Sequence, residues 1–303
     1  GHLGDRVEHF IMVNEPGVAA MLGHLLGQHA PGLSDLTAFS AAVHHLNLAQ
    51  GQALAALKES GNWKLGTVFH LQPVHAAGDT DEDAQAAKLF DAIWNRNYLD
   101  PLLKGRYPDE TAAMLEPYIK GGDLATIKQP LDFLGLNLYT RFLVKADAAS
   151  LVGMKEAPPP PQAELTEMGW EVYPQALLEM LMRLKEDYGN PPLYITENGA
   201  AFADAPGRGG AVHDPERIRF LSRYLEAAQQ ALAAGVDLRG YFVWSLLDNF
   251  EWADGYSKRF GITYVDFQTL ERRPKASYRW YQQLIRTGTL PETSAGLDGD
   301  SQD

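Results

Sequence analysis

The chain has 303 residues, no cysteine, and 39 acidic against 26 basic side chains, which gives a formal net charge of −13 at pH 7. A chain of this length can bury a large core, and without cysteine a disulfide framework and a thiolate metal site are excluded. The negative charge disfavours nucleic acid and anionic membranes as partners, and with no apolar run of bilayer length and no signal-like start we expect a cytoplasmic protein.

Short apolar runs alternate along the chain with patterns typical of helices. The predicted strands cover His9–Val13, Leu65–Leu71, Phe133–Leu138, Leu193–Thr196 and Gly240–Trp244. The predicted helices cover Leu36–Ser60, Glu82–Asn97, Pro174–Tyr188, Asp214–Ala234 and a closing helix over Lys275–Ile285. Wholly apolar strands separated by helices indicate a parallel sheet that is covered on both faces.

Residues typical of helix ends and loops complete this prediction. Asp214 is predicted to cap the helix that begins at Pro215, and Gly235 follows its end. The proline-rich region Ala146–Gly169 is predicted to be a long surface loop, and a further strand is expected within Ile262–Phe267. Residues 1–290 are expected to form one unit, and residues 291–303 a flexible tail.

Two glutamates each end a predicted strand. Glu15 closes Phe10–Val13 and precedes Pro16, and Glu197 closes Leu193–Thr196 and precedes Asn198-Gly199. Each segment alone could be ordinary turn chemistry. Because the carboxyl ends of parallel barrel strands converge on one face, the two carboxylates are expected to meet there. Such a pair is what glycoside hydrolysis requires.

Aromatic and amide side chains gather at the other strand ends. Asn137 and Tyr139 close one run, and Trp244, Asp248, Asn249, Glu251 and Trp252 follow the last strand within nine residues. A lone tryptophan is usually a core residue. Indole faces beside amides and carboxylates at one strand end favour a sugar site. No His-Glu-x-x-His pattern occurs, which makes a metal site of that kind unexpected.

Five segments together resemble the signature segments of family 1 glycoside hydrolases. They are Asn14–Pro16, Met168–Glu171, Ile195–Gly199, Trp244–Trp252 and Gly255–Gly261. The resemblance extends from about Leu3 to Ile285 and implies a (β/α)8 TIM barrel. It implies a retaining β-glycosidase that needs no metal or cofactor and acts on a β-glucoside or cello-oligosaccharide, as in cellulose degradation.

The resemblance also implies roles for individual residues. Glu15 would be the acid/base and Glu197 the nucleophile. The substrate-binding residues would be Asn14, Asn137, Tyr139, Trp170, Trp244, Glu251, Trp252 and Phe260. Among these, Tyr139 would donate a hydrogen bond to Glu197, and Trp244 would form the floor of the sugar site.

Three positions refine the resemblance. A glutamate at position 15, where the plant thioglucosidases have glutamine, favours O-glycosides. The negative charge of Glu251 disfavours a 6-phosphorylated sugar. Leu138 stands where the family usually has tyrosine, and strand alternation predicts that it points away from the site.

A complete barrel has eight strands, whereas five are found here. In the family the Asn-Glu-Pro strand is the fourth, so strands 4–8 are expected and the first three strand–helix units are not found. We therefore expect that the chain needs a complementing N-terminal fragment or second chain. A β-glucosidase with some tolerance for β-galactosides or β-fucosides is the leading hypothesis. An endo-acting barrel glycanase and a non-catalytic, sugar-binding or structural fragment are the alternatives.

Overall fold

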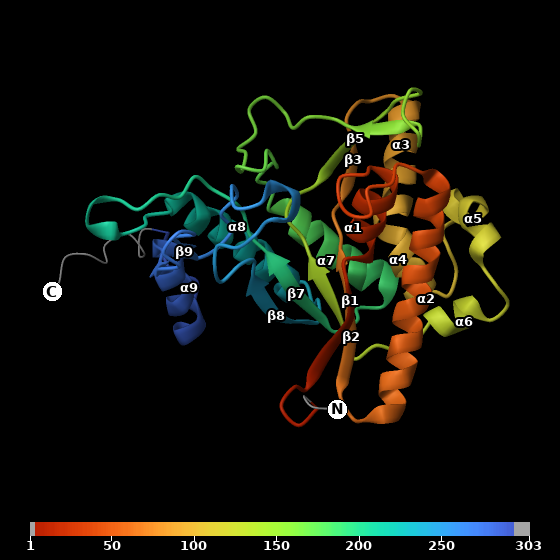
Figure 1. Ribbon diagram of the computed structural model, residues 1–303, viewed down its shortest axis with the longest axis horizontal. Coiled ribbons are helices and arrows are strands. Elements are labelled where there is room, and N and C mark those ends of the chain that lie inside the picture. Colours follow the sequence, from red (N-terminus) through yellow and green to blue (C-terminus); the bar gives the residue numbers. More distant parts are fainter. Residues whose placement is uncertain (1–3, 294–303) are drawn as a thin grey trace.

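The computed structural model describes residues 4–293, and its centre is a five-stranded parallel sheet (Figure 1). The strands lie in the order β1-β2-β4-β7-β8, with every neighbouring pair parallel. Their bounds are β1 His9–Asn14, β2 Lys64–His70, β4 Phe133–Asn137, β7 Leu193–Asn198 and β8 Leu238–Val243. Each predicted strand is confirmed to within two residues at either end.

Pairing in the sheet brings the carboxyl ends of the strands to one edge. Asn14 pairs with Val68, His70 with Asn137, and Asn137 with Glu197. The register shifts between Leu136 and Asn137, so the end of β7 is bulged relative to β4. Polar residues from four strands are therefore neighbours at this edge.

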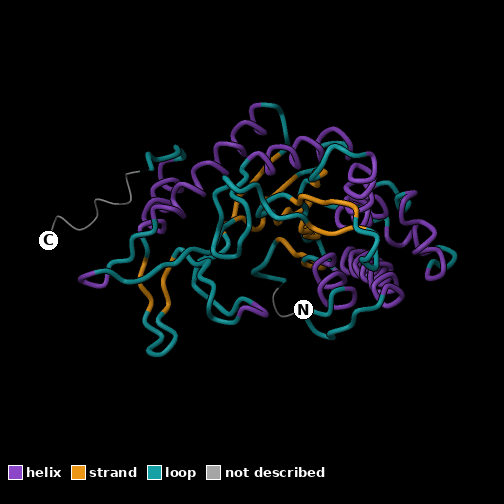
Figure 2. The backbone as a smooth tube through the Cα atoms, turned by 90° about the horizontal axis from the view of Figure 1, so that it is seen from above, coloured by secondary structure: helices purple, strands orange, loops and turns teal. Residues whose placement is uncertain are grey.

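Helices cover the sheet, and Figure 2 shows them as an arc outside the strands. The longer helices are α2 Leu36–Ser60, α3 Asp81–Asp91, α7 Gln175–Tyr188, α8 Pro215–Ala233 and α9 Ala276–Thr287. The shorter ones are α1 Pro16–Ala20, α4 Asn97–Leu103, α5 Asp109–Leu115 and α6 Asp123–Ile127. The helix predicted over Glu82–Asn97 is longer and composite, because a π-helical turn at Ala92–Arg96 joins α3 to α4.

The core lies between the sheet and these helices. Leu134, Leu136 and Ile195 are fully buried there, as is Leu138, which confirms that Leu138 points into the core and not toward the site. β1 and β8 are the outer strands of the described sheet, and both expose large apolar side chains. Ile11 on β1 is 47% exposed and Phe242 on β8 is 56% exposed.

A second, three-stranded sheet corrects one prediction. Its strands are β3 Val74–Ala76, β5 Phe142–Ala146 and β6 Met154–Glu156, and β6 lies inside the region Ala146–Gly169 that was predicted to be loop alone. β6 pairs antiparallel with β5, and its Met154 is buried in the core. Met154 is the only buried residue within β6, so the sequence has no alternating apolar pattern there that would predict a strand.

The C-terminal part contains a short antiparallel hairpin, β9 Thr263–Val265 with β10 Arg272–Pro274, ahead of α9. Asp214 is the N-cap residue of α8, as predicted, although its carboxylate makes no capping hydrogen bond and binds Arg217 and Ser277 instead. Gly235 follows α8 with a positive φ of 84°, as expected. Most of the tail predicted over 291–303, residues 294–303, lies outside the described residues. Within the part that is described, no helix is long and apolar enough to cross a membrane.

Candidate active site

Glu15 directly follows β1, in a backbone conformation that is uncommon for a residue with a side chain. Its φ and ψ are 51° and 57°, in the left-handed region, and its amide donates to Val68 O over 2.9 Å. The following Pro16 is buried at the start of α1. Left-handed non-glycine residues cluster at functional sites, where surrounding structure holds them. Here the turn aims the carboxylate at the sheet edge.

Glu197 is the second-last residue of β7, and its carboxylate is held by Tyr139. The Tyr139 hydroxyl donates to Glu197 Oε2 over 2.5 Å. Burial, with the charge of Glu197 next, raises the pKa of Tyr139 well above its usual value, so the phenol stays protonated as a donor. The tyrosine predicted to bind Glu197 therefore does so.

Asn137, at the end of β4, connects the two glutamate positions. Its Nδ2 donates to Glu15 Oε1 over 2.8 Å and to Asn14 Oδ1 over 3.2 Å. Hydrogen bonds thus join Asn14, Asn137 and Glu15 in one set and Tyr139 and Glu197 in another, and Asn137 pairs with Glu197 in the sheet.

Both carboxyl groups are harder to ionise than in water. Burial raises the pKa of Glu15, and the hydrogen bond from Asn137 opposes that change. Burial, and then the negative charge of Glu15, raise the pKa of Glu197 to about 7, while hydrogen bonds from Tyr139 and Asn137 lower it. Two neighbouring carboxylates that repel each other favour a state in which one is protonated and the other ionised.

Aromatic side chains form a wall beside Glu197. Tyr139 and Phe260 are buried, and Trp170 and Trp244 pack against them partly buried. The ring centroids of Tyr139 and Trp170 are 5.4 Å apart. Trp252 is not part of this wall, since it is 68% exposed and stacks on His29 at a centroid distance of 5.9 Å.

Glu251 is a third acidic group, and it interacts electrostatically with Glu15 and Glu197. Burial raises its pKa to about 7, a hydrogen bond with Trp244 lowers it, and the charges of Asp254 and then of Glu15 and Glu197 contribute further increases. Its Oε2 is buried without a hydrogen-bond partner in the described structure. A buried acceptor of this kind is ready to bind a hydroxyl group.

His70 and Thr196 belong to the site although neither was among the predicted site residues. His70 ends β2, its Nδ1 lies 3.8 Å from Glu15 Oε1, and burial lowers its pKa to about 4, so it is neutral. Thr196 Oγ1 donates to Asn137 Oδ1 over 2.6 Å. His70 could have been found by the rule that located Glu15, because both close a parallel strand.

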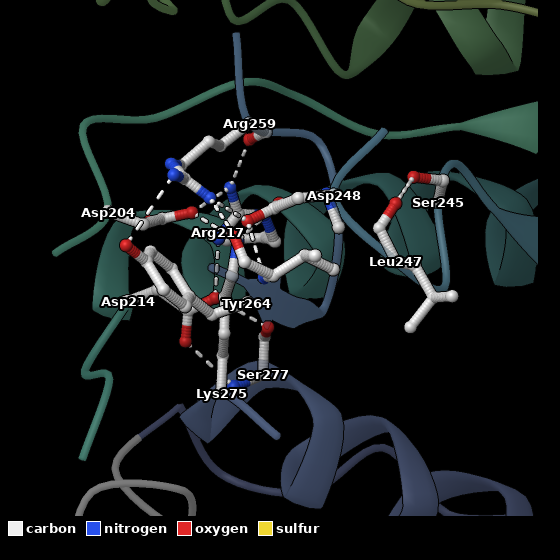
Figure 3. Close-up of polar contacts among 12 residues, drawn as sticks. Asp204, Asp214, Arg217, Ser245, Leu247, Asp248, Arg259, Tyr264, Lys275 and Ser277 are labelled. Carbon is white, nitrogen blue, oxygen red and sulfur yellow. Dashed lines mark hydrogen bonds and ion pairs between the residues drawn. The ribbon is translucent and has the colours of Figure 1, made fainter. Parts of the chain in front are cut away.

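The loop of residues 244–260, here called the site loop, is anchored by a buried charge cluster (Figure 3). Asp248 accepts from Lys275 Nζ at 2.9 Å and from Arg259 at 2.6 Å. Lys275 also pairs with Asp204 at 2.5 Å, and Asp204 pairs with Arg217 at 2.6 Å. With Asp214 bound to Arg217, the cluster holds three acidic and three basic side chains.

Asp248 of the cluster and a backbone hydrogen bond together hold the site loop. Asp248 Oδ1 accepts from the Gly261 amide, and the Ser245 amide donates to Phe260 O over 3.1 Å. Trp244, Glu251, Trp252 and Phe260 all belong to the site loop that these hydrogen bonds hold. In residues 4–293, no three His, Asp or Glu side chains are grouped in a way that could hold a metal ion.

A model of glycosyl hydrolase family 1 matches residues 1–289. The chain belongs to glycosyl hydrolase family 1. Its sheet accordingly supplies five of the parallel strands of that family's (β/α)8 barrel, and the comparisons agree with a partial barrel.

Relatives within the family are named for action on β-glucosides. Beta-glucosidase A of Acetivibrio thermocellus is 43% identical over 295 residues, which are 94% of this chain and 65% of the relative. A bifunctional beta-D-glucosidase/beta-D-fucosidase of Bifidobacterium breve is 44% identical over 93% of this chain and 65% of its own length. The solved structure of a family 1 β-glucosidase from Thermotoga maritima superposes with a TM-score of 0.90 at 40% identity, covering 96% of this chain and 66% of that one. The chain therefore spans just under two thirds of these family 1 relatives.

The charge cluster leads to a stability prediction. Lys275→Met leaves Asp204 and Asp248 buried and facing each other without their shared cation, so we expect a loss of about 3–5 kcal/mol in the free energy of unfolding. Urea unfolding followed by circular dichroism measures it. Arg273→Met, which removes only a pair on the surface hairpin, is the matched control and is expected to unfold close to the wild-type midpoint. Equal midpoints for both variants would contradict a supporting role for the cluster.

Proposed function

We propose that this chain carries the catalytic centre of a retaining β-glycosidase, with Glu15 as acid/base and Glu197 as nucleophile. The observation that carries the proposal is the joint arrangement of the two carboxyl groups. One is bound by Asn137 and the other by Tyr139, and both lie at the carboxyl edge of the same sheet. Two carboxyl groups of unequal protonation are the requirement of the retaining mechanism.

In the first step a Glu197 carboxylate oxygen attacks the anomeric carbon while the bond from that carbon to the leaving oxygen breaks. Protonated Glu15 gives its proton to the leaving oxygen and becomes ionised. In the second step Glu15 takes a proton from water, the water oxygen attacks the anomeric carbon, and the bond to Glu197 breaks. Each glutamate then has its starting protonation again.

The proposed substrates are terminal β-D-glucosides and cello-oligosaccharides, with tolerance for β-fucosides or β-galactosides. The names of the relatives support glucosides and fucosides. Trp244 and the aromatic wall would pack on the sugar face, Asn14 and Glu251 would bind its hydroxyls, and Trp170 would contact the leaving group. The exposed Trp252 would be covered only when sugar binds. The charge of Glu251 disfavours a 6-phosphorylated sugar.

We also propose that activity requires a complementing polypeptide that pairs with β1 and β8. The support is the pair of outer strands in the described sheet, both with exposed apolar side chains, because unpaired strand edges and apolar patches are sites of association. A partner bound there would close the barrel around the two glutamates. A non-catalytic fragment is the remaining alternative, and a cytoplasmic location stays a prediction.

The need for a complementing polypeptide is testable by fusion. The chain is produced alone and behind the first three strand–helix units of the Thermotoga maritima relative, and nitrophenol release from aryl β-glucoside is compared. We expect hydrolysis from the fusion and from the chain alone only aggregation or inactivity. A stable 33.4 kDa monomer with full activity would contradict this proposal while leaving the catalytic assignment intact.

The nucleophile is tested in the active form by Glu197→Ala. We expect kcat to fall about a thousandfold or more, because alanine removes the carboxylate proposed to form the glycosyl-enzyme bond. Glu179→Ala is the control, since that glutamate binds His75 away from the site. Proton NMR of the first product, expected as the β-anomer, tests retention. Full activity of Glu197→Ala would refute the assignment.

Tyr139→Phe tests the electrostatics of the pair. The hydrogen bond from Tyr139 lowers the pKa of Glu197, so its removal raises that pKa. Because the nucleophile acts as the ionised form, the acidic limb of the kcat/KM profile should move to higher pH and activity at acidic pH should fall. Tyr173→Phe, which loses a hydroxyl bound to Glu179, should leave the limb in place. An unmoved limb in Tyr139→Phe would show that this hydrogen bond does not control ionisation of Glu197.

A further inference from the structure

Thr196 directly precedes Glu197 in β7, and its side chain is linked to Glu15 through Asn137. The Asn137 side chain is fully buried, and its two ends have different partners. The NH2 end donates to Glu15 and Asn14, while Oδ1 accepts from the Thr196 hydroxyl over 2.6 Å. The side chains of Thr196, Asn137 and Glu15 therefore form a hydrogen-bonded chain from β7 through β4 to the turn after β1.

The chemistry of the groups determines the direction of this chain. An ionised carboxylate only accepts hydrogen bonds, so Asn137 must present its NH2 end to ionised Glu15. The amide oxygen then faces Thr196 and is buried. A buried acceptor without a donor is costly, and the Thr196 hydroxyl is the donor in the described structure. The hydroxyl therefore favours the amide orientation that suits the ionised form of Glu15.

Two features of the backbone place Thr196 where it can do this. The register between β4 and β7 passes from Leu136–Ile195 to Asn137–Glu197, so Thr196 is the extra residue of the bulged strand. Bulges commonly redirect a side chain beside an active site. Glycine at position 135 supplies the room, since a Cβ there would lie 2.9 Å from Thr196 Cγ2 and 2.5 Å from Val68 Cγ2.

We propose that Thr196 is a positioning residue of the active site, whose hydroxyl fixes the Asn137 amide so that its NH2 end serves Glu15 and Asn14. This inference rests on the proposed roles of Glu15 and Glu197. In the retaining cycle Glu15 is ionised after the first step. When Glu15 is protonated, its O–H must be free to face the leaving oxygen and must not donate a hydrogen bond to the Asn137 amide oxygen. The hydrogen bond from Asn137 lowers the pKa of both glutamates, so loosening the amide raises both values.

The experiment compares Thr196→Val with Thr196→Ser in the active fusion. Valine keeps the shape over Gly135 but has no hydroxyl, whereas serine keeps the hydroxyl. For Thr196→Val we expect about tenfold lower kcat/KM at the wild-type optimum and a pH profile with both limbs moved to higher pH. Thr196→Ser should restore the wild-type limbs. Thr196→Ala replaces the valine variant if valine does not fold.

A matched control separates positioning from packing. Thr67 is a buried threonine on β2 whose hydroxyl, in the described structure, hydrogen-bonds to Gln50 Oε1 and Val13 O, and to neither Asn137 nor a glutamate carboxylate. Thr67→Val should lower Tm and leave both limbs unmoved. The inference is overturned if Thr196→Val keeps the wild-type limbs with kcat/KM within about twofold, or if Thr196→Ser moves the limbs as far as valine does.

A readout that does not need turnover distinguishes failure of this inference from failure of the proposed function. Carbon-13 NMR of labelled glutamate carboxyls, with Glu15 assigned by Glu15→Gln, follows titration directly. If the wild type hydrolyses no aryl glycoside but the Glu15 titration still moves to higher pH in Thr196→Val, the proposed function fails and the positioning role stands. If the wild type is active and the titration is unmoved, the positioning role fails alone.

Discussion

Two carboxyl groups buried at the same sheet edge cannot both be ionised without strong mutual repulsion, and this constraint organises the structure around them. Glu15 and Glu197 both have raised pKa values because burial removes water from the charged form. The surrounding groups respond with neutral donors: the Tyr139 phenol and the Asn137 amide. His70, the nearest ionisable base, is itself buried and neutral. A permanent cation beside the pair would have ionised both carboxyls and left no proton for the leaving group.

The charge cluster around Asp248 is balanced in charge, unlike the pair of glutamates. Three acidic and three basic side chains are buried together there, and each charge has a partner of opposite sign. The pairing removes the tendency to change protonation, which suits an anchor for the site loop. The charge cluster and the glutamate pair thus differ in their balance of charge. The cluster has equal numbers of acidic and basic side chains and keeps its protonation, whereas the pair has an excess of carboxyl groups that can exchange a proton.

Sequence patterns located the strands and the catalytic candidates for a clear physical reason. Buried parallel strands are apolar throughout, so the residue at which the run becomes polar marks the carboxyl edge, as with Glu15 and Glu197. β6 escaped because Met154 is its one buried anchor, and pairing with β5 depends on contacts that are distant in sequence. Asp214 is at the predicted N-cap position, but its carboxylate binds Arg217 and Ser277, and Ser277 is distant in sequence, so this use could not be predicted. Thr196 could not be recognised, since a β-branched residue inside a strand is ordinary and its register depends on a bulge.

The position of each glutamate in the sheet implies unequal support. Glu197 lies at the end of β7, which is paired with β4 on one side and β8 on the other, and Tyr139 holds its carboxylate. Glu15 follows β1, an outer strand paired only with β2 in the described structure, and it occupies a left-handed conformation. Strained backbone persists where neighbouring structure determines it on all sides. Glu15, the proposed acid/base, therefore depends more on contacts made to β1 than Glu197, the proposed nucleophile, depends on contacts made to β7.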